Sequence, residues 1–217
     1  ARDLDSPLIA KEYRRLMVEL DAAPERFAMD IVISPASARQ GRKLLTEAGV
    51  STPYAIFCPF TTRPQKHWLD ERWSLLAQRL REATGIVPIL LGGPADRAHG
   101  EAIAAASRGS ALNLCGLTRL DEGAALIERA TLVVGVDTGM THLGIALDRP
   151  TLTLLGSTDP YFATGTELGR VLYHSLPCFP CYRRPTCQGE FMCMRLHEVD
   201  QVLTAARELL ARAELLH

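Results

Sequence analysis

A polar turn at Asp137-Thr138-Gly139 has the residue types and the setting of a ligand-binding loop. An apolar, β-branched run precedes it at Leu132–Val136, which is typical of a strand buried on both faces. A helical pattern follows at Met140–Leu147, and the order strand, turn, helix directs free backbone N–H groups toward a bound anion. Asp137 and Thr138 could bind ligand hydroxyls, and Gly139 permits close approach to the backbone. A helix-capping loop without a ligand explains the same residues equally well.

A second loop combines hydroxyl groups with a positive charge. Thr61, Thr62 and Lys66 follow the apolar run Tyr54–Cys58, which predicts another buried strand. Two hydroxyl donors and one ammonium group suit the oxygens of a phosphate. Ligands of open α/β sheets bind at the carboxyl ends of strands, so this loop is a candidate phosphate site. The alternative is a solvated loop in which Lys66 faces water.

Other polar residues stand at or just beyond predicted strand ends. Asp96 follows Gly92-Gly93-Pro94 and could accept hydrogen bonds from both hydroxyls of a ribose, or simply begin a helix. His142 lies one turn into the helix after Asp137, where it could donate to a phosphate or sugar oxygen or serve as a core histidine. Thr158-Asp159 could line the same crevice, but Asp159-Pro160 is also ordinary turn chemistry.

Short strands alternate with helices along most of the chain. This alternation predicts an α/β fold, a Rossmann-like, mostly parallel sheet with helices on both faces. The dinucleotide fingerprint G-x-G-x-x-G and the P-loop pattern are absent, which argues against NAD enzymes and P-loop NTPases. The predicted strands are Asp30–Ser34, Tyr54–Cys58, Ile86–Leu91, Ala111–Leu114, Leu132–Val136, Thr151–Leu155 and Val171–His174. The predicted helices are Leu8–Leu20, Ala38–Ala48, one from Asp70 to Gly85, Asp96–Ala106, Glu122–Ala130 capped by Asp121, Met140–Leu147 and His197–Leu216.

Length and composition restrict the class of protein. The 217 residues suffice for one large domain, or one domain with an appendage. A formal net charge of −1 argues against a nucleic-acid partner. No apolar run is long enough to span a bilayer, and the polar start Ala1–Asp5 does not resemble a signal peptide. We therefore expect a reducing, cytoplasmic environment for the six cysteines.

Four of the cysteines crowd into one loop, at Cys178, Cys181, Cys187 and Cys193. A structural zinc site, disulfides and free thiols are the three alternatives for them. The spacing is tighter than in common zinc modules. Cys58 and Cys115 sit in or beside apolar runs and are expected to be buried. Basic residues in the Cys-rich loop, Arg183, Arg184 and Arg195, could contact phosphates or be solvated.

Several motifs follow one another from about Tyr54 to the C-terminus. They are Lys66-His67-Trp68 with Glu71 and Trp73, Leu91-Gly92-Gly93-Pro94, Asn113-Leu114-Cys115-Gly116, Asp137–His142 and Gly156-Ser157-Thr158-Asp159-Pro160. Together these motifs are similar to those of lipopolysaccharide heptosyltransferases, the family 9 glycosyltransferases with two Rossmann-like domains (the GT-B arrangement). The cysteines favour the heptosyltransferase-II-like branch.

The resemblance implies a division of the chain. Residues 1–50 would be an inter-domain helix and lead-in, and residues 51–217 the C-terminal, donor-binding domain, with the Cys-rich loop 178–193 and the C-terminal helix. The family's acceptor-binding half, which carries the Asp usually proposed as catalytic base, has no counterpart in this sequence. We therefore expect no catalytic base in this chain.

The resemblance also implies roles for individual residues. Thr61, Thr62 and Lys66 match the diphosphate-binding loop. Asp137, Thr138 and Gly139 match the turn that holds donor sugar and phosphates, and His142 matches the histidine that closes that motif. The segment around Leu117 is similar to the one that packs on adenine, and Asp96 stands near the acidic position that binds ribose.

The implied reaction is an inverting transfer of heptose from ADP-L-glycero-D-manno-heptose to the lipopolysaccharide inner core. It requires no cofactor and no obligatory metal, and it would occur in the cytoplasm, where peripheral association with the inner membrane is compatible with the acceptor. We expect this chain alone to bind the ADP-sugar weakly and not to turn it over. Two alternatives stay open: a non-catalytic nucleotide-binding module, and a glycosyltransferase with another donor such as a UDP-sugar.

Overall fold

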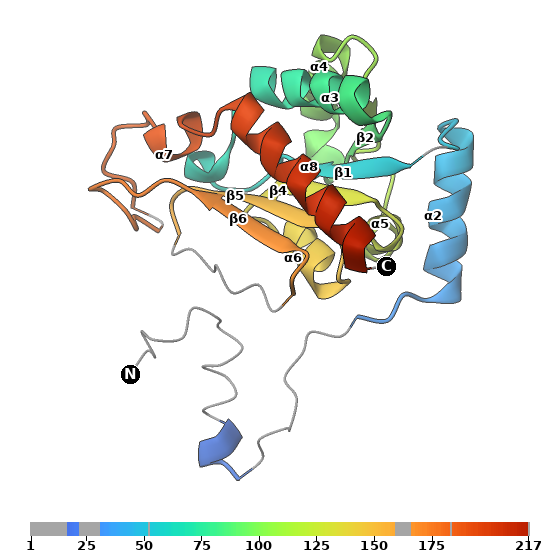
Figure 1. Ribbon diagram of the computed structural model, residues 1–217, viewed down its shortest axis with the longest axis horizontal. Helices are drawn as coiled ribbons and strands as arrows, with labels where there is room; N and C mark the ends of the chain where they lie inside the picture. The colour runs from blue at the N-terminus through green and yellow to red at the C-terminus, as the bar shows by residue number, and fades with distance from the viewer. Residues whose placement is uncertain (1–16, 22–30, 52, 159–165, 183, 217) are drawn as a thin grey trace.

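The computed structural model describes residues 17–21, 31–51, 53–158, 166–182 and 184–216, which build a parallel sheet covered by helices on both faces (Figure 1). The order of the six strands is β3-β2-β1-β4-β5-β6, and every neighbouring pair is parallel. Strands β2 and β3 are therefore added on one side of β1, and β4 to β6 on the other, so the strand order reverses between β1 and β4. The strands are β1 (Tyr54–Cys58), β2 (Val87–Leu90), β3 (Leu112–Asn113), β4 (Leu132–Val136), β5 (Thr151–Leu155) and β6 (Gly169–Tyr173).

The helices divide between the two faces. One apolar cluster joins the sheet to α3 (Asp70–Thr84), α4 (Arg97–Ala106) and α8 (Val199–Leu216). The other joins it to α2 (Pro35–Glu47), α5 (Leu120–Glu128) and α6 (Gly139–Ala146). Figure 1 shows α8 crossing the near face of the sheet, with α5 and α6 behind it. The predicted α/β fold class is confirmed.

The buried strands explain how the sequence specifies two layers of helices. All five residues of β1 are buried, and alternate side chains belong to opposite clusters: Ala55 and Phe57 face α3, whereas Ile56 and Cys58 face the other helices. A continuous apolar run is what a strand covered on both sides needs. The bounds predicted for β1, β4 and β5 agree with the structure.

Helix α3 also follows the predicted pattern. Asp70 and Glu71 occupy its first turn, where carboxylates suit the helix dipole. Trp73 and Leu80 belong to its buried face, and Trp73 packs edge-on against Trp68 with ring centroids 5.0 Å apart. The helix ends at Gly85, whose φ of 73° lies in the left-handed region.

Two predictions near α2 and α5 are wrong. Residues 31–34 form no strand, because Ser34 instead caps α2 and its hydroxyl accepts a hydrogen bond from the Ser37 N–H at 3.0 Å. Helix α5 begins at Leu120 rather than Glu122, and Asp121 is not its cap. The Arg119 N–H donates to the Glu122 carboxylate at 2.9 Å, which places the start of the helix two residues earlier.

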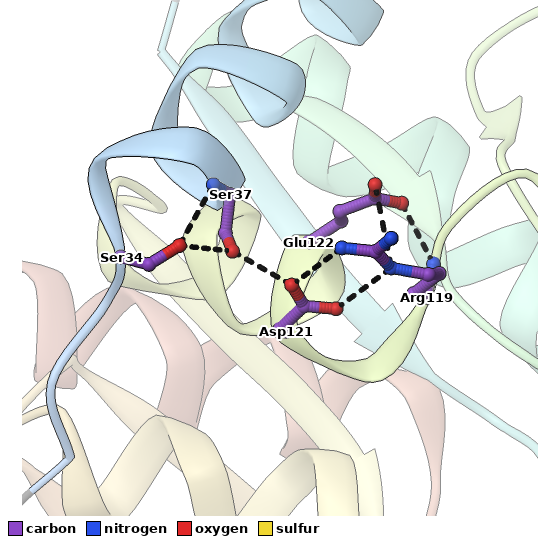
Figure 2. Close-up of polar contacts among 5 residues, drawn as sticks. All are labelled: Ser34, Ser37, Arg119, Asp121 and Glu122. Carbon is purple, nitrogen blue, oxygen red and sulfur yellow. Dashed lines mark hydrogen bonds and ion pairs between the residues drawn. The ribbon is translucent and has the colours of Figure 1, made fainter.

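Asp121 instead ties α5 to α2, as Figure 2 shows. The Ser37 hydroxyl donates to Asp121 Oδ2 at 2.7 Å, and Arg119 donates to both carboxylate oxygens. These hydrogen bonds, that from Arg119 first, hold the pKa of the Asp121 carboxyl well below its usual range. The network fixes the N-terminal turn of α2 on α5.

The remaining elements differ from the predictions mainly at their ends. A short helix in the Cys-rich loop, α7 (Met192–Arg195), was not predicted, and two 3₁₀ turns, η1 (Pro64–Lys66) and η2 (Pro94–Asp96), follow β1 and β2. Most of the predicted helix Leu8–Leu20 lies outside the described residues, as does Asp159. None of the helices within the described ranges is long and apolar enough to cross a membrane.

Candidate functional site

A cavity of about 770 Å³ opens at the carboxyl edge of the sheet, where β1 and β4 lie side by side. Strand order reverses between these two strands, and this is the position where open α/β sheets bind ligands. Five loops contribute to the wall. The lining residues are Phe60, Thr61, Thr62, Arg63, Lys66, Asp96, Asp137, Thr138, Gly139, Thr158 and Tyr182.

Lys66 and Asp137 form an ion pair in this cavity. The Lys66 ammonium donates to Asp137 Oδ2 at 2.6 Å, and both side chains are mostly buried, with 19% and 13% of their surface exposed. The Thr158 hydroxyl donates to the same oxygen at 2.9 Å, and His142 Nε2 lies 3.1 Å from Oδ1. The pair therefore joins the loop after β1 to the turn after β4.

The pKa of Asp137 reflects two opposing effects. Burial raises it, but the hydrogen bonds from His142, Lys66 and Thr158, together with the Lys66 charge, outweigh burial and hold the pKa well below its usual range. Asp137 is therefore a carboxylate at neutral pH. A carboxylate held this acidic is a poor proton acceptor.

The turn after β4 presents backbone groups to the cavity. Thr138 is the N-cap residue of α6 and lines the cavity with Gly139, yet no side chain in the described part of the chain caps the helix there. The first N–H groups of a helix carry partial positive charge and suit an anion. A Cβ added to Gly139 would meet no atom within 4 Å, so the cavity side of this residue is open.

The base of the same turn is tightly packed. A Cβ added to Gly135, in β4, would lie 2.0 Å from Thr141 Oγ1 and 2.8 Å from the Cβ of Cys58. The Thr141 hydroxyl donates to the Val136 carbonyl at 2.7 Å, which holds α6 against the end of β4. Only glycine leaves room for this contact.

Asp96 begins the segment before α4 and also lines the cavity. Its carboxylate accepts a hydrogen bond from the Gly93 N–H at 2.8 Å, so it stabilises the turn that precedes α4. It also lines the cavity at the β2 end, next to Phe60. A local hydrogen bond to Oδ2 leaves the carboxylate further acceptor capacity toward the cavity.

Two residues proposed from the resemblance do not line the cavity. His142 contacts Asp137 from within α6 and is not among the residues that line the cavity. Leu117 follows β3 at the outer end of the sheet and has 41% of its surface exposed. The structure thus brings together seven of the nine proposed residues: Thr61, Thr62, Lys66, Asp96, Asp137, Thr138 and Gly139.

Sequence reasoning missed three lining residues, Phe60, Arg63 and Tyr182. Phe60 and Arg63 flank the two threonines, and their position after β1 was sufficient to propose them. Tyr182 comes from the irregular Cys-rich loop, where no periodic pattern indicates its position. Thr158 was suggested as a crevice residue, and the structure places it there.

The cysteines of the Cys-rich loop are free thiols. Cys178 is exposed, Cys181 and Cys187 are half-buried, and Cys193 is buried. Within the described ranges, no three His, Cys, Asp or Glu side chains are arranged to hold a metal ion. The zinc and disulfide hypotheses therefore gain no support from this structure. Cys58 and Cys115 are buried, as predicted, and burial raises the pKa of each thiol to about 12.

The fold and this cavity define a class: a parallel α/β domain with a polar cavity at its switch point. Comparison with known proteins gives the family. The profile of glycosyltransferase family 9 (heptosyltransferase) matches residues 4–190, and this chain belongs to that family.

Individual relatives agree with the family assignment. Lipopolysaccharide heptosyltransferase 1 of Pseudomonas aeruginosa is 39% identical over 153 residues, covering 67% of this chain and 41% of that protein. The structure of E. coli ADP-heptose lps heptosyltransferase II matches with a TM-score of 0.73 and 25% identity, covering 89% and 57% of the two chains. E. coli heptosyltransferase WaaC with ADP-2-deoxy-2-fluoro heptose matches with a TM-score of 0.56 and 28% identity, covering 77% and 47%. The chain thus spans about half the length of these relatives.

Proposed function

We propose that this chain is the donor-binding domain, residues 51–217 with the lead-in 1–50, of a heptosyltransferase that transfers heptose from ADP-heptose to the lipopolysaccharide inner core. The observation that carries the proposal is the cavity at the β1–β4 switch point, where Lys66 meets Asp137 beside the open end of α6. A family relative bound to an ADP-heptose analogue supports the choice of donor. The acceptor would place the enzyme at the cytoplasmic face of the inner membrane.

The residues at the cavity suit a nucleotide diphosphate. Lys66 supplies a point charge, Thr61 and Thr62 supply directional hydroxyl donors, and the amides at Thr138 and Gly139 supply the positive end of a helix. Negative charge develops on the diphosphate as the bond to the sugar breaks, so these groups stabilise the leaving group. Asp96, at the β2 end, accepts hydrogen bonds from the ribose hydroxyls.

The transfer step itself also requires a general base. The acceptor oxygen forms a bond to the anomeric carbon while the bond from that carbon to the phosphate oxygen breaks, and ADP leaves with the electron pair. The acceptor hydroxyl must lose its proton to a base. Asp137 is too acidic for this role and is already engaged by three donors. We therefore expect the base to come from outside the described cavity, and this chain alone to bind donor without transferring sugar.

Calorimetric titration of the 217-residue chain with ADP and with UDP tests the donor class. ADP is expected to bind and UDP to bind at least tenfold more weakly, since the base is the part of the ligand that differs. Tighter binding of UDP would indicate a UDP-sugar as the donor in place of ADP-heptose. Binding of neither nucleotide would contradict the proposal. Sugar transfer by the chain alone in a radiolabel assay would show that the base lies within it.

A further inference from the structure

Tyr182 enters the cavity wall with an unusual backbone conformation. Its φ of 49° lies in the left-handed region, which residues other than glycine rarely adopt. Two hydrogen bonds hold it there. The Tyr182 N–H donates to the Ser157 carbonyl at 2.8 Å, and Gln65 Nε2 donates to the Tyr182 carbonyl at 2.8 Å.

The two residues that hold Tyr182, Ser157 and Gln65, are sequence neighbours of residues that contact Asp137. Ser157 precedes Thr158, and Gln65 precedes Lys66, so the Cys-rich loop is fastened to the two segments that contact Asp137. Gln65 is buried, with 4% of its surface exposed, which leaves its side chain little freedom to adopt another position. The position of Tyr182 is therefore coupled to the position of Lys66.

A glycine would satisfy the backbone at this position with less strain than a tyrosine. The side chain, rather than the backbone, thus accounts for the tyrosine. It lines the cavity, and 45% of its surface is exposed. Aromatic side chains combine an apolar ring with a polar hydroxyl, a pairing that suits the C–H groups and hydroxyls of a sugar.

Strand order indicates which part of the ligand lies at Tyr182. Asp96 and Phe60 line the cavity on the β2 side, Lys66 and Thr138 lie at the centre, and Thr158 and Tyr182 lie on the β5 side. A diphosphate at the centre divides a nucleotide sugar into two arms. With the ribose arm at Asp96, as the proposed function has it, the other arm extends toward Tyr182.

We infer that Tyr182 is a specificity-determining residue of the donor site, which contacts the transferred sugar and not the nucleotide. This inference rests on the proposed function and assigns the Cys-rich loop a role in selecting the sugar. Gln65 is a positioning residue that acts through Tyr182.

The test compares ADP with ADP-L-glycero-D-manno-heptose as calorimetric probes of wild type and Tyr182→Ala. Loss of the ring is expected to weaken ADP-heptose binding about tenfold and ADP binding less than twofold. Tyr182→Phe should retain most of the ADP-heptose affinity, because the ring remains. Gln65→Leu should cause a smaller loss that is selective for ADP-heptose in the same way.

Tyr182→Gly separates the ligand effect from folding. Glycine fits the left-handed backbone, so this variant should lose ADP-heptose affinity as Tyr182→Ala does, while melting no lower than Tyr182→Ala. Gln188→Gly is the matched control, since Gln188 is an exposed residue of the same loop with φ 52° and does not line the cavity. It should leave both affinities unchanged.

The outcomes distinguish the two proposals. Equal loss of ADP and ADP-heptose binding in Tyr182→Ala, with wild type binding both, would overturn the inference alone and place the nucleoside at this residue. Unchanged binding of both probes would overturn it as well. Failure of wild type to bind either probe would overturn the proposed function, and the inference with it.

Discussion

Lys66 and Asp137 are separated by 71 positions in the chain, and their side chains meet at 2.6 Å across the carboxyl edge of the sheet. Pairing of β1 with β4 in parallel register brings their two loops together. The contact balances one positive with one negative charge inside a cavity that we assign to a diphosphate. An incoming anion must therefore share the Lys66 ammonium with Asp137.

Replacing Lys66 tests the central charge. Lys66→Met keeps the apolar stem but removes the ammonium, so affinity for ADP should fall by about 10- to 100-fold. Asp137 loses one of its donors, and the free energy of unfolding should fall by about 1–3 kcal/mol. Calorimetry and urea denaturation measure the two effects. Lys43→Met is the control, because Lys43 is exposed and its pair with Glu47 spans 3.7 Å. Equal ADP affinity in wild type and Lys66→Met would contradict the assignment.

Two glycines near the cavity should respond in opposite ways to alanine. Gly135→Ala places a methyl group 2.0 Å from Thr141 Oγ1, so it should lower the free energy of unfolding by about 3 kcal/mol or more. Gly139→Ala meets no atom within 4 Å and should leave stability unchanged or raise it by up to about 1 kcal/mol. Its methyl group nevertheless lies where the ligand approaches the helix amides, so ADP affinity should fall. A stable Gly135→Ala protein, or unchanged ADP binding by Gly139→Ala, would count against this geometry.

His197 should make stability depend on pH in a defined window. Burial lowers its pKa to about 4, and its Nε2 contacts the Leu155 carbonyl at 3.0 Å. Below pH 6.5 this histidine is protonated in the unfolded chain but remains neutral in the folded protein. The free energy of unfolding therefore falls as the pH is lowered from about 6.5 to 4, by about 3 kcal/mol in total. Below that window the folded histidine also binds the proton and its contribution changes no further.

Urea denaturation at a series of pH values measures the contribution of His197 to the pH dependence of the free energy of unfolding. His197→Gln keeps a donor near Leu155 but does not titrate, so its stability should change little between pH 6.5 and 4.5. A slope that survives in His197→Gln would show that another group is responsible.

The cap of α2 offers a test of stability without a change in binding. Ser34→Ala removes the acceptor for the Ser37 N–H and should cost about 1 kcal/mol of unfolding free energy. Ser34→Asn restores a capping side chain and should recover most of the loss. The exposed Ser51→Ala serves as control. ADP affinity should be the same in all three variants, because none of these residues lines the cavity.

Much of the fold follows from local sequence patterns. The mostly apolar runs of β1, β4 and β5 are buried at every position, which is typical of strands covered on both faces, and their predicted bounds agree with the structure. The start of α5 was placed too late because Asp121 looked like a cap. Glu122, three residues after Arg119, was the better indication of where the helix begins.

The cavity could be predicted only where strand ends define it. Lys66, Asp96 and Asp137 each follow a strand, and parallel strands bring their carboxyl ends to one edge. Tyr182 lies in the irregular loop well beyond the end of β6, and its place depends on hydrogen bonds of its main chain with the Ser157 carbonyl and the Gln65 side chain. Such contacts between distant segments leave no periodic trace in the sequence, so this residue required the structure.

The cavity wall draws on residues from Phe60 to Tyr182, contributed by loops after five different strands. A nascent chain on the ribosome therefore cannot complete this wall until nearly the whole sheet has emerged and paired. Under the proposed function ADP binds the folded state alone, so nucleotide at 100 times its Kd should add about 2.7 kcal/mol to the stability of the chain. A thermal-shift assay with ADP measures this stabilisation as a rise in melting temperature.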